Sequence, residues 1–565
     1  MSVKFSVPTR FRPPKLSAPS GDDARAGLVL GLVSIPDGLA AGLLAGLNPV
    51  AGLYGYLFGT LAGALSTSSA LMSVQATGAM AVIIADVPGL GSGPNAAANL
   101  ATLSVMTGLV MLAVGLAGLG SLVRYVPHSV LAGFVNAVAV NIMLGQLSAF
   151  TGFQGRGENR ITRALDTLWN FTSFHWPTLI IALLTLALIL VLERTRLGAL
   201  GLFVAVVISS GLVALVNWFT SVATLADLAD VPSGLPTPVL PSLAMVVPLT
   251  VPALSLAFVG LVQGAAIGQS IPNPDGNYSD PSGDFRGQGV ANIASGLLRG
   301  MPVGGSMSAT SLVVSAGAKG RYGNVIAAIV MALGILVLGP GVGVVAMPAL
   351  AALLMLIGYR TLKPHQISMV WRTGATQATV MTTTFILTLQ IPMQYAVLVG
   401  VGISVILYVA RQSNRVTVKQ WTFGPDSELP TETTPPAVLP ANEMVVLTPY
   451  GSLFFASASV FESQLPVVEP ASRGSVVVIS MRGKEDLGST FINIMVRYHD
   501  SLQEVGSQLI LTGLGERVFS QLANTGALET LGRENVFEVT PQIGESLKAG
   551  LRRAQILVER SADAD

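Results

Sequence analysis

Apolar stretches alternate with short polar stretches from about residue 25 to residue 413 of this 565-residue chain. Most apolar stretches approach the length of about 20 residues that a helix needs to cross a membrane. The pattern predicts a polytopic α-helical membrane protein with 14 transmembrane segments in two sets of seven. The first set is 25–46, 50–69, 77–89, 98–122, 128–150, 175–193 and 199–219, and the second is 248–269, 287–300, 306–317, 323–345, 347–361, 375–390 and 392–413.

Two of these segments, 77–89 and 306–317, are too short to cross a membrane by themselves. Each lies at a stretch rich in Gly, Ser and Thr: Val74–Ala81 reads VQATGAMA and Pro302–Ser311 reads PVGGSMSATS. Glycine-interrupted segments at corresponding places in two halves of a chain indicate a transporter binding site between broken helices. The pattern therefore predicts two half-helices preceded by extended chain, and it makes the chain a candidate carrier.

The composition agrees with a membrane protein and excludes several classes of function. Hydrophobic residues make up 51% of the chain and the mean hydropathy is +0.65. Charged residues make up 11%, against about 25% in soluble domains. The net charge of +1 gives no sign of a nucleic-acid partner, and the absence of cysteine excludes disulfides, thiolate metal sites and cysteine catalysis. The four histidines lack metal-site spacing, and we expect no enzymatic activity, no cofactor and no metal.

Positive charges indicate the orientation of the segments. With the N-terminus inside, Lys and Arg collect at the cytoplasmic ends, as the positive-inside rule requires. The 151–174 loop, with Arg156, Arg160 and Arg163, would lie outside and departs from the pattern. Residues 1–24 lack the features of a signal peptide and are expected to be a cytoplasmic leader, so both termini would be cytoplasmic in a cell (inner) membrane. The cytoplasmic charges are Arg25, Arg124, Arg194, Arg196, Lys319, Arg321, Arg360, Lys363 and Arg411.

The composition changes after the last apolar segment. Residues 414–440 are polar and Pro-rich, which predicts a linker after a transmembrane domain spanning 25–413. In residues 441–560, apolar runs such as SVVVISM and QLILTGL alternate with helical stretches. This region is expected to be a small soluble α/β domain.

Four stretches of the membrane region carry a resemblance to a known family. They are SIPDGLAAGLLAGLNPVAGLYGYLFGTLAGAL, VPHSVLAGFVNAVAVNIMLGQL, VPSGLPTPVLPSL and GQGVANIASGLLRGMPVGGSMSATSLVVSAGA. In order and spacing they resemble the sulfate permease (SulP) family of anion transporters. The C-terminal region resembles a STAS domain, the cytoplasmic module usual in that family, so the similarity covers nearly the whole chain.

The resemblance implies a fold and an activity. It implies two inverted seven-helix repeats, divided into a core and a gate domain that move like an elevator, and a homodimer in membrane lipid. It implies secondary active transport of a small anion, with sulfate as the family default and bicarbonate or a dicarboxylate as alternatives. An anion channel on the same scaffold stays open, as does a membrane-anchored signalling scaffold whose STAS domain binds a cytoplasmic protein. A nucleobase or ascorbate transporter is disfavoured by Gln263 and Ala309.

In such a fold the two half-helices point their N-termini at each other near the middle of the membrane. Unpaired N–H groups and the partial positive charge of a helix N-terminus hold an anion without a basic side chain. This matters because the family often has Arg where this chain has Ala309. For any single hydroxyl, the alternative role is a bond to its own backbone. The expected substrate-binding residues are Gln75, Ala76, Thr77, Gly78, Gln263, Gly305, Ser306, Met307, Ser308 and Ala309.

Asp37 is an acidic residue inside a membrane segment, a costly placement that marks a functional site by default. It follows Pro36, which lacks a backbone N–H, and it stands where the family commonly has Gln. Because a carboxylate removed from water binds a proton more readily, we expect Asp37 to couple anion transport to protons. The structural alternative is that Asp37 faces water or caps backbone N–H groups.

Two further expectations concern sodium and the C-terminal domain. Sodium-dependent bicarbonate transporters of the family carry Asp and Thr one helical turn apart in the eighth segment. This chain has Gln263 and Ile267 there, which offer no negative ligand, so sodium coupling is not expected. In the STAS-like domain, Ser489 or Thr490 is expected to cap a helix rather than to be phosphorylated.

Overall fold

The computed structural model divides the chain into two compact units, 1–404 and 405–565, which are described separately. It describes residues 19–562 except for a few short stretches. Those stretches are 92, 121–126, 158, 228–233, 393–394, 396–398, 400–401, 404, 408, 411–415 and 425–428. The last expected segment, 392–413, therefore falls largely outside the described residues.

The first unit is helical, and each expected segment up to 375–390 overlaps one of its helices. Pro and Asn at helix starts, as at Asn48 and Pro49, help to set the boundaries because Pro needs no N–H acceptor at the first helical position. The helices are α1 (Gly21–Leu44), α2 (Pro49–Ser66), α3 (Gly78–Ala85), α4 (Ala96–Leu116), α5 (His128–Thr151), α6 (Arg160–Trp169), α7 (Trp176–Leu192), α8 (Leu200–Thr220), α9 (Thr250–Ser270), α10 (Pro281–Leu297), α11 (Met307–Ser315), α12 (Tyr322–Val342), α13 (Met347–Thr361), α14 (Pro364–Thr373) and α15 (Ala375–Gln390).

Some helices of the first unit are long and apolar enough to span a membrane, and others are not. Among the described residues, α1, α4, α5 and α9 are long and apolar enough to cross a membrane by those two measures alone. The short helices α6 and α14 were not expected from the apolar pattern, because each carries charged residues among its apolar ones. The half-helices α3 and α11 have 8 and 9 residues, close to the expected short segments.

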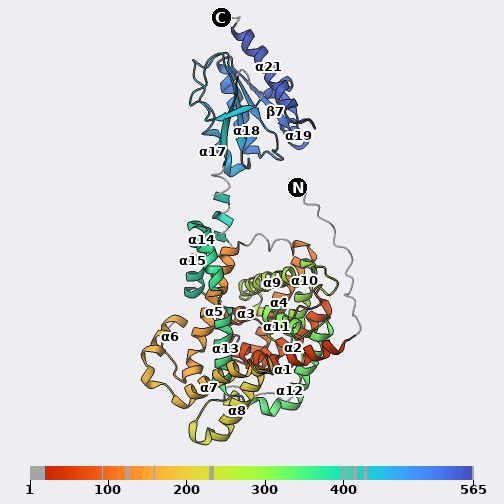
Figure 1. The fold of residues 1–565 in the computed structure, drawn as a ribbon, viewed down its shortest axis with the longest axis vertical. Helices are drawn as coiled ribbons and strands as arrows, with labels where there is room; N and C mark the ends of the chain where they lie inside the picture. Colours follow the sequence, from red (N-terminus) through yellow and green to blue (C-terminus); the bar gives the residue numbers. More distant parts are fainter. Residues whose placement is uncertain are drawn as a thin grey trace. The chain divides into compact units, whose positions relative to one another are not determined.

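The helices of the first unit pack as two groups (Figure 1). One group, called here the strand-bearing group, consists of α1, α2, α3, α4, α9, α10, α11 and α12 and contains two short strands. The other, called here the flanking group, consists of α5, α6, α7, α8, α13, α14 and α15. The groups meet where α1 packs on α8 and α13 and where α3 packs on α5.

The second unit is a six-stranded sheet covered by helices on both faces. The strand order is β4-β3-β5-β6-β7-β8, and β5 to β8 run parallel. The strands are β3 (Thr417–Phe423), β4 (Pro430–Thr433), β5 (Met444–Tyr450), β6 (Val476–Ser480), β7 (Gln508–Leu514) and β8 (Val536–Glu538). The helices are α17 (Ala458–Glu462), α18 (Ser489–Glu504), α19 (Glu516–Asn524), α20 (Ala527–Leu531) and α21 (Glu545–Ala562). Alternate residues of β6 enter two separate apolar clusters, so both faces of the sheet are buried.

Two sequence expectations about this unit need correction. The stretch expected to be a linker, 414–440, contains β3 and β4, which pair antiparallel with each other, and β3 also pairs with β5. The high Pro content of the stretch as a whole favoured a linker, but the one proline within these strands, Pro430, lies in the edge strand β4, where Pro is tolerated. Helix α18 begins at Ser489 with Gly488 in the N-cap position and no side-chain cap bond, so neither Ser489 nor Thr490 caps it.

Candidate functional site

The two half-helices begin at a short pair of strands. Strand β1 (Val74–Gln75) pairs antiparallel with β2 (Gly304–Gly305), and the Ser306 N–H extends the ladder by donating to the Ser73 carbonyl at 2.9 Å. Helix α3 starts immediately after its N-cap, Thr77, and α11 starts immediately after its N-cap, Ser306. The strand pair gives the extended backbone hydrogen-bond partners, which non-helical chain inside a membrane domain requires.

Both strands lie directly on glycines of neighbouring helices. A Cβ atom at Gly59 of α2 would come within 2.8 Å of the Val74 carbonyl oxygen. A Cβ atom at Gly305 would come within 2.8 Å of the Cα of Gly264 on α9. Any side chain at these positions would push strand and helix apart, so the glycines allow the half-helix starts to lie deep within the helix group.

Two buried asparagines hold the chain just before each strand. Asn292 of α10 donates to the Val303 carbonyl at 2.7 Å and accepts from the Val303 N–H at 2.9 Å, as a neighbouring strand would. Asn324 of α12 donates to the carbonyls of Leu71 and Met72 at 3.3 and 3.2 Å. The sequence analysis missed both residues, although each is an amide inside an expected membrane segment.

The half-helix N-termini keep free donors. The hydroxyl oxygens of Thr77 and Ser306 accept from the N–H groups of Met80 and Ala309, at 3.4 and 3.3 Å. Among the described residues, the two N–H groups nearest each helix start have no acceptor: Gly78 and Ala79 in α3, Met307 and Ser308 in α11. Such groups, with the positive end of the helix dipole, can bind a negative charge.

Gln263 of α9 is hydrogen-bonded to the N-cap residue of α3. The Thr77 hydroxyl donates to its Oε1 at 3.0 Å, which leaves the Gln263 amide nitrogen without a bond among the described groups. A Cβ atom at Gly78 would lie 2.6 Å from the terminal methyl of Ile142 on α5, so a side chain there would require that methyl to move. Met307 is 43% exposed within the chain and Ser308 is exposed, so the start of α11 is the more open of the two.

The remaining predicted residues lie behind this opening. Gln75 is 1% exposed, and its amide donates to the hydroxyls of Ser34 on α1 and Thr60 on α2, at 3.0 and 3.2 Å. Ala76, just after β1, and Gly305 of β2 are buried, and Ala309 packs in an apolar cluster with Ala26 and Leu30 of α1. Gln75 thus fastens β1 to two helices, and its two amide hydrogens are already used.

Asp37 lies on α1 one helical turn beyond Ser34, the residue that binds Gln75. Its Oδ2 accepts from the hydroxyl of Tyr56 on α2 at 2.9 Å, and Tyr56 is 4% exposed. The other carboxylate oxygen has no bond to any described residue. Asp37 is partly exposed within the chain. The sequence analysis missed Tyr56, whose only signal was a second tyrosine in the apolar GLYGYLFG stretch.

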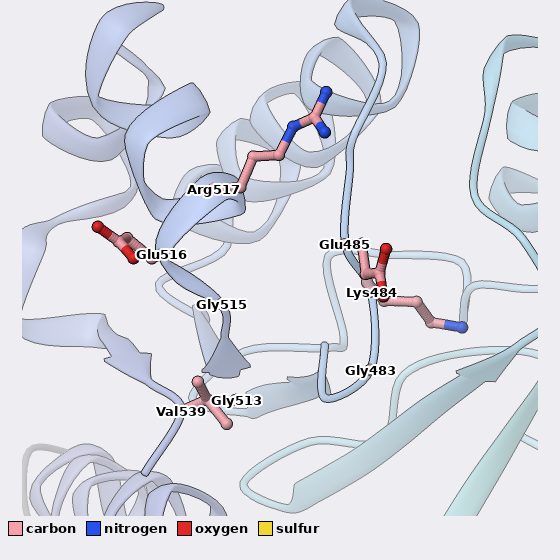
Figure 2. Close-up of a pocket in the computed structure, with 8 residues that line it drawn as sticks. All are labelled: Gly483, Lys484, Glu485, Gly513, Gly515, Glu516, Arg517 and Val539. Carbon is pink, nitrogen blue, oxygen red and sulfur yellow. The ribbon is translucent and has the colours of Figure 1, made fainter. Parts of the chain in front are cut away.

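The second unit has a shallow cleft at the carboxyl ends of its parallel strands (Figure 2). Its two cations are already engaged: Lys484 donates to the Gly451 carbonyl at 2.7 Å, and Arg517 pairs with Asp486 at 2.9 Å. In Figure 2 these two side chains point away from each other. Burial lowers the pKa of Lys484. Within the described residues, no group of His, Asp and Glu could hold a metal ion. The cleft therefore offers no evident catalytic or metal chemistry.

The chain thus has the fold of a helical membrane protein in which two broken helices meet at a strand pair, and it carries a second, α/β unit. The model of the sulfate permease family matches residues 22–384, and the STAS domain model matches residues 435–543. The chain belongs to the sulfate permease family, a family of transporters rather than enzymes, and it carries a C-terminal STAS domain.

Curated relatives support this assignment. A probable sulfate transporter of Mycobacterium tuberculosis (strain CDC 1551 / Oshkosh) is 31% identical over 350 residues, which cover 60% of this chain and 61% of the relative. The chain thus matches less than two thirds of that relative's length. The chloroplastic sulfate transporter 4.1 of Arabidopsis thaliana is 22% identical over 539 residues, covering 91% of this chain and 78% of the relative.

Solved structures share the fold. The murine Slc26a9 anion transporter, solved in its inward-facing state, aligns with a TM-score of 0.83 at 19% identity, covering 96% of this chain and 92% of that one. The transmembrane domain of the cyanobacterial bicarbonate transporter BicA aligns with a TM-score of 0.57 at 20% identity, covering 70% and 98%. At these identities the similarity establishes the fold alone.

Proposed function

We propose that the chain is a secondary active transporter that carries a small anion across the membrane. One observation carries the proposal: two half-helices start side by side at a strand pair, and each start keeps backbone N–H groups without acceptors. None of the contacts described at this site involves Lys or Arg. Helix N-termini therefore have to supply the positive potential that attracts the anion.

Sulfate is the first candidate cargo, because the curated relatives are named as sulfate transporters. Bicarbonate and small dicarboxylates are the alternatives; the structural neighbour BicA is named as a bicarbonate transporter. The donors proposed to face the anion are the N–H groups of Gly78, Met307 and Ser308, the Ser308 hydroxyl, and the free amide of Gln263, whose Oε1 is held by the Thr77 hydroxyl. Gln75, Ala76, Gly305, Ser306 and Ala309 are proposed to shape the site around them.

Asp37 is proposed to bind the coupled proton. Its bond from Tyr56 fixes one carboxylate oxygen, and the second oxygen is free to take up a proton. Such a carboxylate inside a membrane domain is the usual kind of proton site in transporters. Sodium coupling is not proposed, because Gln263 and Ile267 supply no negative ligand.

The finer architecture is also a proposal. The strand-bearing group would be the core that carries the anion, and the flanking group the gate against which it moves like an elevator, in a fold of two inverted seven-segment repeats. The proposed domains are a leader (1–24), a transmembrane domain (25–413) and the STAS domain (441–560), whose sheet is extended by β3 and β4 of the 414–440 stretch. The protein would be a homodimer in the inner membrane with both termini cytoplasmic, and its STAS domain could bind a cytoplasmic protein.

Purified protein in liposomes tests the proposal. Uptake of radiolabelled sulfate, bicarbonate and fumarate is measured with and without an inward proton gradient. A carrier accumulates its cargo above the equilibrium level when the gradient is present, whereas a channel only equilibrates it. Wild-type liposomes that merely equilibrate the anion would favour the channel, and liposomes that take up none would favour the signalling scaffold.

Asp37→Asn is the matched variant for proton coupling. We expect it to abolish accumulation driven by the proton gradient, because an amide binds no proton in this pH range. Ser489→Ala in the STAS domain serves as the control and should leave uptake unchanged. Proton influx at the wild-type ratio to anion in Asp37→Asn would refute the coupling role of Asp37.

A further inference from the structure

The distal end of α3 is bonded to a helix of the other group. Asp86, the C-cap residue of α3, forms an ion pair with Arg160 on α6, with an Nη2–Oδ1 distance of 2.8 Å. The same guanidinium nitrogen lies 3.4 Å from the Val82 carbonyl in the last turn of α3. The side chains of Arg160 and Asp86 are 18% and 22% exposed. A cation at a helix C-terminus is favoured by the helix dipole, so Arg160 binds both the carboxylate and the helix end.

Helix α6, which carries Arg160, belongs to the flanking group because it packs on α5. Several hydrogen bonds fix its start and the loop before it. Asn159 caps its start through a reciprocal pair of bonds with Thr162. Asp166, in the middle of the helix, accepts from the Arg156 N–H at 2.7 Å and so closes the preceding loop onto α6. Arg160 is therefore presented by an ordered element rather than by a loose loop.

The corresponding end of α11 is held differently. The chain just after α11 is bonded to α1, within the strand-bearing group: Asp23 accepts from the N–H groups of Lys319 and Gly320 at 2.8 and 2.9 Å. Asp23 is 1% exposed and also holds the start of its own helix through Ser20. The end of α3 is thus bonded to a helix of the other group, whereas the chain after α11 is bonded to a helix of its own group.

With the N-terminus inside, the two ties lie on opposite sides of the membrane. The chain passes outward along α1 and back along α2, so α3 runs from mid-membrane to the outer surface and α11 runs to the cytoplasmic surface. Asp86 and Arg160 then lie at the outer surface, while Asp23 and Lys319 lie at the inner one. Arg160 is one of the outer-loop arginines that departed from the positive-inside pattern, and this ion pair gives it a structural role.

The geometry points to a latch: the Arg160–Asp86 ion pair holds the strand-bearing group against the flanking group on the outer side, and it breaks each time the anion site opens outward. This inference rests on the proposed transport function. A partly buried pair between two rigid elements suits this role, because it adds to the stability of one arrangement and is lost in the other. Helix α3, about 12 Å long, connects the latch to the anion site at its other end.

A cross-linking experiment tests whether the latch must open. The chain has no cysteine, so Asp86→Cys with Arg160→Cys introduces the only two thiols. A short reducible bis-methanethiosulfonate reagent should lower anion uptake more than tenfold, and a reductant should restore it. The control pair, Arg156→Cys with Asp166→Cys, lies entirely within the α6 region and should tolerate the same cross-link. Full uptake by the cross-linked latch pair would overturn the inference.

An accessibility experiment separates the latch from the transport function itself. Ser308→Cys provides a single thiol at the open start of α11, and a membrane-impermeant maleimide is applied from outside. Without the latch, in Arg160→Ala or Asp86→Asn, we expect the outside labelling rate to rise at least threefold; the exchange Asp86→Arg with Arg160→Asp should lower it again. An unchanged rate in both single variants would refute the latch. The labelling rate can be measured without transport. A wild type that takes up no anion would therefore refute the proposed function, while the labelling rates would still test the latch.

Discussion

The two half-helices have the same local design but different surroundings. Each follows a two-residue strand and begins at a hydroxyl-bearing N-cap, Thr77 in one case and Ser306 in the other. The Thr77 hydroxyl is bonded to Gln263 of a neighbouring helix, whereas the Ser306 hydroxyl is bonded to Ser308 of its own helix at 3.2 Å. The start of α3 is thus fixed by its neighbours, and the start of α11 is open.

The ends of α3 and α11 that lie away from the strand pair also differ in their bonds. The end of α3 is tied to the flanking group through Arg160, and the end of α11 is tied to its own group through Asp23. The same local motif therefore has different bonds at its two copies: both helix starts keep N–H groups without acceptors among the described residues, whereas of these two end contacts only that of α3 reaches the other helix group. The expected consequences can be ranked by size.

The largest effect is expected from a negative charge at the open helix start. Ser308→Glu should lower anion uptake at least a hundredfold, because the carboxylate occupies the positive end of the helix dipole in place of the substrate. Ser315→Glu places the same charge at the exposed far end of α11 and is the matched control. Initial uptake rates in liposomes measure both. Equal losses in the two variants would show that the helix start is not the anion site.

A smaller effect is expected from the residues that hold the strands. Asn292→Ala removes both bonds to Val303, and Asn324→Ala removes the bonds to Leu71 and Met72. Each should lower the free energy of unfolding by about 2–4 kcal/mol, since buried backbone groups lose their partners. Thermal unfolding in detergent measures the change.

Asn99→Ala is the control for these two variants, because it removes an exposed bond, from the Asn99 amide to the Gly89 carbonyl. Asn99→Ala should leave the unfolding temperature within the error of the wild type. If Asn292→Ala or Asn324→Ala also leaves the unfolding temperature unchanged, the strand pair does not depend on that side chain.

The smallest effect is expected from single hydroxyls at the two helix starts. Thr77→Val should weaken anion binding about fivefold, near 1 kcal/mol, because it removes the hydroxyl that holds Gln263 and so frees the Gln263 amide to rotate. Ser308→Ala removes a hydroxyl from the open helix alone and should weaken binding only about twofold. Anion-dependent thermal shifts or equilibrium binding measure both. A larger loss in Ser308→Ala than in Thr77→Val would reverse the assignment of the fixed and the open half-helix.

The positions of the two half-helix starts could be predicted from the chain because local signals and the helix breaks coincide. Stretches rich in Gly, Ser and Thr interrupt apolar segments at two places, and both half-helices begin within these stretches. The partner residues could not be predicted in this way. Tyr56 binds Asp37 across 19 positions, and Asn292 binds Val303 across 11, and neither spacing has a periodicity that local structure imposes. The β3 and β4 strands were missed because the stretch that contains them is polar and Pro-rich, which is typical of loops, although Pro is tolerated in an edge strand such as β4.

The order of apolar and polar residues by itself determined that this protein is helical, membrane-embedded and broken at two points, because burial in lipid demands long apolar stretches and Gly or Ser is needed where a helix ends inside them. Tertiary structure alone decided which strands pair, which half-helix is open and which helix end is tied to the other group. Those features depend on contacts between residues far apart in the chain, such as Asp86 with Arg160 and Ser73 with Ser306. Such contacts form only when the packed helices bring their partners together.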